Sequence, residues 1–465
     1  MNEILRQIPK IDLIIELLPE KYLEQLDIQH IKTVIDENLN DLRTQIVKGK
    51  INEVVVNEVI LNIVDSLERL LTHNIKHVIN ASGIVLHTNL GRAVLSKQTL
   101  SYLEETMSHY NTLEYDLIKG GRGSRYAHVE GLLCRLTNAE AALVVNNNAA
   151  AVILVLNTLA NDKEVILSRG ELVEIGGSFR IPDVMKASGC KLVEVGTTNK
   201  THLYDYENAI SSETGMILKV HTSNYQILGF THSVDRESLG ELSRKIEIPF
   251  YEDLGSGAII NFDTIEGLQE PCISECIRAG VDLISFSGDK LLGASQAGII
   301  VGKKKYIDLL KKNQLLRALR IDKLSLAVLE DTLIKYQNKQ NAILDIPTLS
   351  MLHMSEDAVY EKVTRFVKAN QYALQKINMR YAIEPMVSQV GGGALPLVEL
   401  PSYGLTLKGD LNLNNLQIAM RKLNVPIICK IDNESIHFDF RTIFDDEFSM
   451  LIDGITTVTL GAQLE

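Results

Sequence analysis

Lys290 stands in the segment Phe286 to Gly293, directly after an apolar run that is typical of a buried strand. A lysine at the edge of a sheet, where water is restricted, can keep a neutral amine and form a Schiff base with an aldehyde. Taken alone, however, a lysine in a loop is better explained as a solvated surface residue. The interpretation therefore depends on which chemical groups accompany Lys290.

Asp253 is one such group. It follows a predicted strand at 248–251 and precedes Gly255 and Gly257. Pyridoxal-phosphate chemistry needs a carboxylate beside the pyridinium nitrogen, because a protonated nitrogen makes the ring an electron sink. The alternative is an aspartate that caps a helix. Together, Asp253 and Lys290 indicate a pyridoxal 5'-phosphate site.

A phosphate site is indicated earlier in the chain, where Asn146, Asn147 and Asn148 follow an apolar run and precede three alanines. Free backbone N–H groups and the helix dipole make a helix N-terminus favourable for an anion. We expect the three asparagines to cradle the cofactor phosphate. An ordinary helix cap is the alternative, and it would require only one of them.

Asn224 completes the candidate cofactor site. It lies in the polar segment 219–225, which follows another predicted strand. Among the polar residues of this segment, Asn224 is the better candidate for contacting the ring oxygen of the cofactor. The chain order is phosphate cradle, polar strand end, aspartate and lysine. This order is that of a fold-type-I, aspartate-aminotransferase-like domain, and the joint match is far more specific than any single part.

The elements that must position these residues change in character along the chain. Residues 1–76 show helical periodicity only, and form a predicted helical N-terminal domain. Residues 77–336 alternate short apolar runs with helical stretches, which indicates an α/β catalytic domain with a mostly parallel sheet. Residues 337–465 read as a small α+β domain. The main predicted strands are at 142–145, 165–167, 191–195, 216–220 and 283–286, and the C-terminal domain should contain a helix at 357–377 and strands at 427–431 and 435–438.

The composition of the chain argues against several classes of protein. The chain has 465 residues, 45% of them hydrophobic, with no long apolar run and no signal-peptide pattern, so we expect a cytoplasmic protein without a membrane span. A net charge of −12 argues against broad, non-specific binding of nucleic acid. The five cysteines are scattered and include no Cys-x-x-Cys pair, so neither a disulfide framework nor a metal site is expected.

Long polar segments in this chain resemble one family, the bacterial selenocysteine synthases or L-seryl-tRNA(Sec) selenium transferases. The resemblance covers most of the chain from about Val78 to Tyr336 and continues more weakly beyond it. Generic pyridoxal-phosphate enzymes do not share such segments. The segments are 79–83, 86–93, 121–125, 128–130, 144–151, 168–182, 196–201 and the loop of Asp289 and Lys290.

The resemblance implies conversion of serine, esterified to a dedicated tRNA, into selenocysteine, with selenophosphate as the selenium donor. Lys290 would hold the cofactor and then exchange for the seryl amine. Loss of the Cα proton and elimination of the β-hydroxyl would leave an aminoacrylyl-tRNA, to which selenium adds. A pyridoxal-phosphate lyase or transaminase acting on a free amino acid or amino sugar phosphate is the alternative, although such an enzyme would not need the helical N-terminal domain.

The donor requires a second anion site near the reacting carbon, and the family places arginines there. The matching residues are Arg92, Arg317 and Arg320. Arg317 and Arg320 are three residues apart and are expected to share one helix face. A solvated basic helix face is the alternative.

The resemblance also implies a large homo-oligomer, a ring of dimers, and a tRNA-binding role for residues 1–76. That segment carries nine Lys and Arg against thirteen Asp and Glu, so tRNA recognition would rest on shape and a few basic residues. The chain departs from the family pattern at three places, Ala294-Ser295, Leu316 and Ala394. The first of these is expected to alter the rigidity of the loop behind Lys290.

Overall fold

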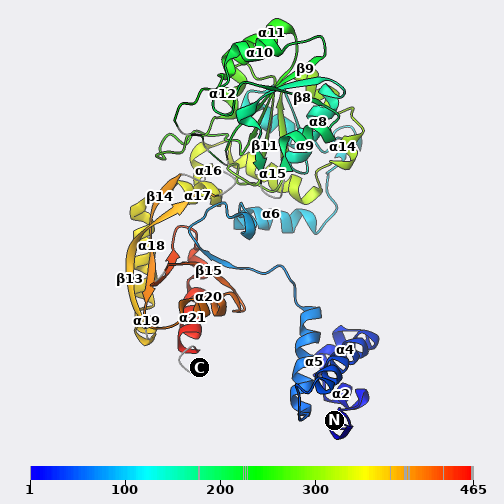
Figure 1. Ribbon diagram of the computed structural model, residues 1–465, viewed down its shortest axis with the longest axis vertical. Helices are drawn as coiled ribbons and strands as arrows, with labels where there is room; N and C mark the ends of the chain where they lie inside the picture. Colours follow the sequence, from blue (N-terminus) through cyan, green and yellow to red (C-terminus); the bar gives the residue numbers. More distant parts are fainter. Residues whose placement is uncertain are drawn as a thin grey trace. The chain divides into compact units, whose positions relative to one another are not determined.

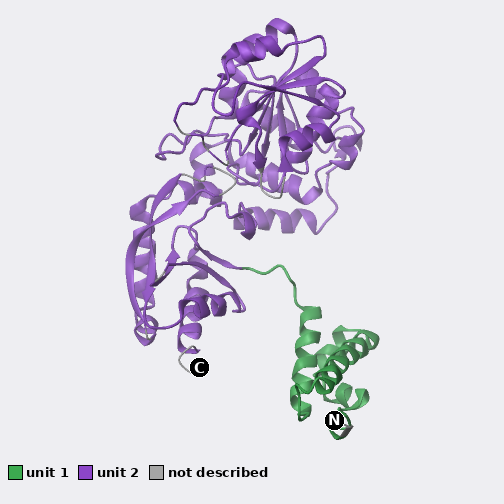
Figure 2. Cartoon of the chain, in the orientation of Figure 1, with its two compact units in different colours: residues 1–77 green, residues 78–465 purple. Residues whose placement is uncertain are grey.

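The computed structural model describes residues 2–175, 179–223, 225, 227, 229–377, 379–391, 395, 398–432 and 434–461. The chain forms two compact units, Met1–His77 and Val78–Glu465 (Figure 2). Each unit has its own apolar core.

The first unit is helical, as its periodicity predicts. Its core contains the fully buried Ile14, Ile31, Ile35 and Ile63, of which Ile31 and Ile35 are four residues apart on one helix face. The helices are α1 (Asn2–Leu5), α2 (Ile11–Leu17), α3 (Glu20–Gln25), α4 (Ile28–Val47) and α5 (Val56–Leu71).

A seven-stranded sheet forms the centre of the second unit (Figure 1). Every pair of neighbouring strands is parallel except the two pairs that include β12, which runs antiparallel to β4 and β11. The predicted mostly parallel sheet is therefore confirmed. In spatial order the strands are β4 (Ala141–Val145), β12 (Gly298–Gly302), β11 (Leu283–Ser287), β10 (Phe250–Gly255), β9 (Thr214–Val220), β5 (Glu164–Ser168) and β8 (Lys191–Val195).

Helices cover both faces of this sheet, because most of its strands are apolar on both sides. One face packs against α8 (Asn148–Ala160), α9 (Ile181–Ala187), α13 (Lys304–Leu310) and α14 (Leu315–Ala318). The other packs against α7 (Ala127–Thr137), α10 (Leu203–Ala209), α11 (Arg236–Ile246), α12 (Ile273–Arg278), α15 (Lys323–Lys335), α16 (Lys339–Asp345) and α17 (Pro347–His353).

A second sheet has five strands, which come from the first residues and from the C-terminal part of the second unit. Its first strand, β1 (Ile79–Ala81), pairs in parallel with β15 (Ile427–Ile431), although it precedes the whole catalytic segment in sequence. The order is completed by β16 (Ser435–Asp439), β14 (Glu399–Lys408) and β13 (Arg380–Gln389). This sheet packs against α18 (Glu356–Ala369), α19 (Gln371–Lys376), α20 (Leu413–Arg421) and α21 (Phe448–Gly461). The predicted division at residue 336 stays a prediction.

Two details differ from expectation. The single helix predicted at 357–377 is broken at Asn370, which has φ −112° and ψ 17° and separates α18 from α19. Strand β12 was not predicted, although an apolar run between Gly298 and Gly302 signals it. The remaining elements are η1 (Thr88–Leu90), α6 (Lys97–Met107), β2 (Tyr115–Asp116), β3 (Gly121–Arg122), η2 (Arg169–Glu171), β6 (Glu174–Ile175), β7 (Phe179–Arg180) and η3 (Asp445–Glu447).

Across the residues that the structure describes, no helix combines the length and the apolar character needed to cross a membrane.

Candidate active site

Lys290 follows β11 at the edge of the large sheet where β4, β9 and β10 also end. Its loop is held by backbone hydrogen bonds, in which Gly288 donates to Ala297 O at 2.9 Å and Ala294 donates to Gly288 O at 2.8 Å. Gly293 adopts φ 73°, and a side chain there would collide with Ile346. The loop therefore fixes the position of Lys290.

The Lys290 side chain is buried, with 8% of the residue exposed. Burial lowers the pKa of its amine below the ordinary lysine value, and the positive charge of Arg92 lowers it further, whereas the Asp253 carboxylate opposes the shift. A lowered pKa increases the fraction of neutral, nucleophilic amine at neutral pH. The environment thus suits a lysine that attacks a carbonyl carbon.

Asp253 lies in β10 and is almost completely buried. Its Oδ1 accepts hydrogen bonds from Asn148 Nδ2 at 2.8 Å and from the backbone N–H of Gly255 at 3.0 Å. Burial raises the pKa of the carboxyl group, while the Asn148 hydrogen bond lowers it. Within the described part of the chain, Asp253 Oδ2 has no hydrogen-bond partner.

The three asparagines have three different environments. Asn147 caps α8, since its side chain accepts from Ala150 N at 2.9 Å. Asn148 is the first residue of that helix and reaches Asp253, while Asn146 is exposed and its backbone N–H donates to Leu319 O at 3.0 Å. The helix start therefore lies beside the aspartate, and the phosphate-cradle role of the three residues stays a prediction.

Arg92 lies next to the Lys290 loop. Its Nη1 donates to Asp289 Oδ2 at 2.9 Å, and its backbone has φ 61°, which is uncommon for any residue other than glycine. Its backbone N–H donates to His87 O at 3.1 Å, which closes the turn around η1. The structure thus brings Arg92 and Lys290 together from opposite ends of the catalytic segment.

The expected pairing of Arg317 and Arg320 on one helix face is wrong. Helix α14 ends at Ala318, so Arg317 is helical, whereas Arg320 forms an antiparallel bridge with Val145 at the end of β4. Arg320 Nη1 lies 3.4 Å from Glu114 Oε1. Both arginines are exposed. Backbone pairing with the sheet overrides the helical spacing at this point.

Glu114 is a site residue that the sequence interpretation missed. It accepts from Arg125 Nη2 at 2.6 Å and from Arg125 Nε at 2.9 Å, in addition to its contact with Arg320. The Arg125 guanidinium lowers the pKa of the Glu114 carboxyl. The signal in the sequence was an acidic residue, Glu114, shortly before a basic segment that includes Arg122 and Arg125.

Two of the departures from the family pattern have a structural explanation. Ser295 donates its hydroxyl to Ser325 O at 2.6 Å, and Ala294 is buried, so the pair ties the loop behind Lys290 to α15. Leu316 is buried in the core on the α8 face of the sheet, where a charged side chain would be costly. Ala394 and the predicted ring-oxygen ligand Asn224 lie outside the described residues.

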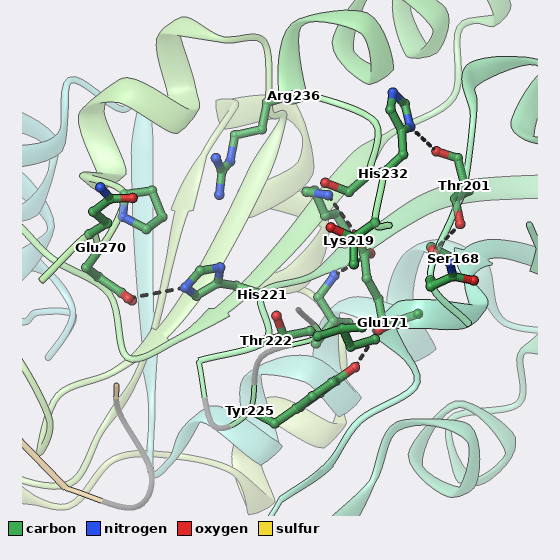
Figure 3. Close-up of a pocket in the computed structure, with 18 of the residues that line it drawn as sticks. Ser168, Glu171, Thr201, Lys219, His221, Thr222, Tyr225, His232, Arg236 and Glu270 are labelled. Carbon is green, nitrogen blue, oxygen red and sulfur yellow. Dashed lines mark hydrogen bonds and ion pairs between the residues drawn. The ribbon is translucent and has the colours of Figure 1, made fainter. Parts of the chain in front are cut away.

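A cavity of about 860 Å³ opens beside this site, at the ends of β5, β8 and β9. His221 lies in its wall, and the imidazole Nε2 is 3.2 Å from Oε2 of the buried Glu270 (Figure 3). The His221 backbone N–H donates to Asp253 O at 2.9 Å. On the other side, Lys219 Nζ donates to Glu171 Oε1 at 2.7 Å. The sequence interpretation gave these residues no role, because Glu171 and Glu270 are far from His221 in the chain.

The arrangement passes a test of fit for pyridoxal phosphate. The unpartnered Asp253 Oδ2 can accept a hydrogen bond from a protonated ring nitrogen, and the Lys290 amine has a lowered pKa. The start of α8 presents backbone N–H groups beside the same carboxylate. Among the residues described, no group of three or more His, Cys, Asp or Glu could hold a metal ion.

Comparison with solved structures supports the same fold. The structure is similar to D-glucosaminate-6-phosphate ammonia-lyase, with a TM-score of 0.57 and 18% sequence identity over 85% of this chain and 98% of that one. At this level of identity the likeness concerns the fold alone. It confirms the predicted aspartate-aminotransferase-like fold class.

Comparison of sequences is more specific. Residues 78–444 match the protein family described as L-seryl-tRNA selenium transferase. The L-seryl-tRNA(Sec) selenium transferase of Clostridium botulinum (strain Loch Maree / Type A3) is 45% identical over 97% of this chain and 98% of its own length. The protein of the same name from Clostridium perfringens (strain 13 / Type A) is 46% identical over 98% and 99%. The resemblance predicted from the sequence is confirmed, and the chain belongs to the L-seryl-tRNA selenium transferase family.

Proposed function

We propose that this chain converts L-seryl-tRNA(Sec) into L-selenocysteinyl-tRNA(Sec) with selenophosphate as the selenium donor. The chain is an enzyme, a transferase, and its cofactor is pyridoxal 5'-phosphate. The observation that carries the proposal is the convergence of buried Lys290 and buried Asp253 in a chain that matches the family from residue 78 to 444.

Different residues have different proposed roles in binding the cofactor and in the reaction. Lys290 would hold the cofactor covalently, Asp253 would keep the ring nitrogen protonated, and the start of α8 would bind the phosphate. When bound, the cofactor supplies an electron sink for the pair of electrons left at Cα. Lys290 Nζ would take the Cα proton, and the β-hydroxyl would gain a proton and leave Cβ as water. The selenium of selenophosphate would then bond to Cβ while Cα regains a proton, and water would cleave the P–Se bond and release phosphate.

Arg92 is the proposed contact for the selenophosphate anion, together with Arg317 and Arg320. Its support is its place next to the Lys290 loop, where a guanidinium can bind a phosphate-like group through two parallel hydrogen bonds. Arg317 and Arg320 are exposed, and their positions leave their guanidinium groups accessible to an anion or to another subunit.

The proposal also includes partners beyond the small substrates. The helical unit 1–77 would bind the tRNA, and the chain would assemble into a large homo-oligomer, a ring of dimers, in the cytoplasm where aminoacyl-tRNA is used. The support is that the relatives named as selenium transferases align with this chain over nearly its whole length, which includes that unit.

The test is a transfer assay with purified protein, seryl-tRNA(Sec) and selenophosphate, beside a Lys290→Ala variant and beside free serine. We expect selenium in the aminoacyl-tRNA only with the unaltered protein and the tRNA substrate. Turnover of free serine alone, or of another free amine, would replace the proposal with the lyase or transaminase alternative.

A further inference from the structure

The cavity beside Lys290 has no role in the chemistry described so far. We propose that it binds the 3'-terminal nucleoside of the aminoacyl-tRNA, an uncharged ribose and adenine, while the donor anion binds on the Arg92 side. This inference rests on the proposed function and names a subsite for its larger substrate. The volume of about 860 Å³ falls in the range of sites that enclose a small organic group.

The position of the cavity suits the ester. Ser223 Oγ and Lys290 Nζ lie 3.5 and 3.9 Å from the point where a Cβ on Gly255 would stand, so the two atoms flank the same position and are no farther apart than the sum of these two distances. Thr222, the residue before Ser223, lines the cavity. The seryl amine must reach Lys290, and the ester oxygen is three bonds away, a distance of about 4 Å. The ribose would therefore stand at the mouth of the cavity.

The charge of the residues that line the cavity favours the uncharged nucleoside over the donor anion. Of its Lys and Arg residues, Lys219 is paired with Glu171, and Arg236 is paired with the buried Glu252. The lining contains three Lys and Arg residues against five Asp and Glu residues, the acids being Glu171, Asp263, Glu266, Glu270 and Glu275. Such a lining disfavours a phosphate-like dianion. It places no such penalty on an uncharged nucleoside.

The shape of the lining suits a base. The rings of His221, Tyr225 and His232 line the cavity, and each is held by a hydrogen bond (Figure 3). His232 is also stacked on His202, with ring centroids 4.5 Å apart. Nucleobases stack on aromatic side chains of this kind, including histidine. Hydroxyl groups such as those of Thr198 and Ser233 lie in the same wall and can pair with ribose or base edges.

The experiment measures binding to the holoenzyme by equilibrium dialysis. The probe is 3'-deoxy-3'-(L-serylamino)adenosine, in which an amide replaces the labile ester, and L-serinamide is the probe without a nucleoside. Thr198→Trp and Ser233→Trp fill the cavity from two exposed positions. Ser212→Trp is the matched control, because Ser212 is exposed and precedes β9 at the end of the strand remote from the cavity.

We expect each filling variant to weaken binding of the nucleoside probe by at least about tenfold. Binding of L-serinamide should stay unchanged in every variant, and Ser212→Trp should bind both probes as the unaltered protein does. Inorganic phosphate should not displace the nucleoside probe. Unchanged binding of the nucleoside probe in both filling variants would overturn the inference. Phosphate that displaces the probe from the unaltered protein, but not from Ser233→Trp, would also overturn it, because the cavity would then bind an anion.

The transfer assay separates this inference from the proposed function. If the unaltered protein transfers selenium and the filling variants bind the probe normally, the cavity inference fails and the function stands. If probe binding depends on the cavity and no selenium is transferred, the function fails and the nucleoside site stands.

Discussion

Asn148 donates its side-chain amide to Asp253 Oδ1 at 2.8 Å, and it does so from the first residue of the helix that begins at the candidate phosphate site. The contact joins the phosphate end of the site to the ring-nitrogen end. The contact also affects the ionisation of the Asp253 carboxyl group. Burial raises the pKa of this group, and the Asn148 hydrogen bond lowers it.

Replacing Asn148 should therefore change the pH dependence of the reaction. In Asn148→Ala the pKa of Asp253 loses its largest lowering contribution and rises further. Since the ionised carboxylate is the active form, the acid limb of the transfer rate should move to higher pH. Asn147→Ala is the neighbouring comparison, because it removes the helix cap at the proposed phosphate site and costs about 1 kcal/mol of stability without touching Asp253. It should weaken cofactor binding and leave the acid limb in place. Acid limbs at the same pH in Asn148→Ala and the unaltered protein would contradict the assignment.

Arg92 should control how readily the apoprotein takes up its cofactor. Its positive charge lowers the pKa of Lys290, so Arg92→Ala raises that pKa and reduces the neutral amine at a given pH. The rate of appearance of bound-cofactor absorbance, measured against pH, should therefore have its midpoint at higher pH. Arg92→Lys keeps the charge and should keep the midpoint. A midpoint that does not move in Arg92→Ala would show that Arg92 does not contribute to the lowered pKa of Lys290.

The ion pair of Arg236 and Glu252 should be important for folding. Arg236 donates to both carboxylate oxygens of Glu252, whose side chain is completely buried. Arg236→Leu leaves that charge unpaired and should cost about 3–5 kcal/mol in urea unfolding, while the double variant with Glu252→Leu should recover much of it. Lys304→Leu, which breaks an exposed pair with Asp308, should have no measurable effect. Equal changes in the free energy of unfolding in Arg236→Leu and Lys304→Leu would show that the buried ion pair contributes no more to stability than the exposed one.

Much of this site could be predicted from local sequence. Lys290 and Asp253 each follow a short apolar run, and parallel strands end at a common edge of their sheet, so chain order alone placed them together. Such reasoning uses only the spacing of neighbours in the chain. It therefore succeeded for most strands of the large sheet and for the helical character of the first unit, although it missed β12.

Contacts that depend on distant segments could not be predicted in this way. Arg320 leaves its helix because Val145, at the end of β4, offers a backbone partner. Glu114 contacts Arg320, and Glu270 contacts His221, across long stretches of chain. No periodicity encodes these pairings, because they arise only when the sheet has assembled.

A fourth prediction concerns the boundary between the two units. Strand β1 pairs with β15 through Ile79 and Ile427, and Thr442 Oγ1 donates to Asn80 O at 2.7 Å. Tolerance of a truncation depends on the burial and hydrogen bonding of the backbone that is removed. A chain of residues 78–465 keeps β1 and should fold and bind pyridoxal phosphate as the full chain does. A chain of residues 83–465 lacks β1 and should lose stability in the five-stranded sheet.

The same pair of truncations tests the role of the helical unit. If residues 1–77 bind the tRNA, the 78–465 chain should show a KM for seryl-tRNA(Sec) raised by at least about tenfold, with its cofactor absorbance intact. The 83–465 chain controls for loss of fold, because it should lose cofactor binding and transfer together. Equal KM values for the full chain and the 78–465 chain would exclude a contribution of the helical unit to tRNA binding, and recognition would then have to lie within the catalytic unit.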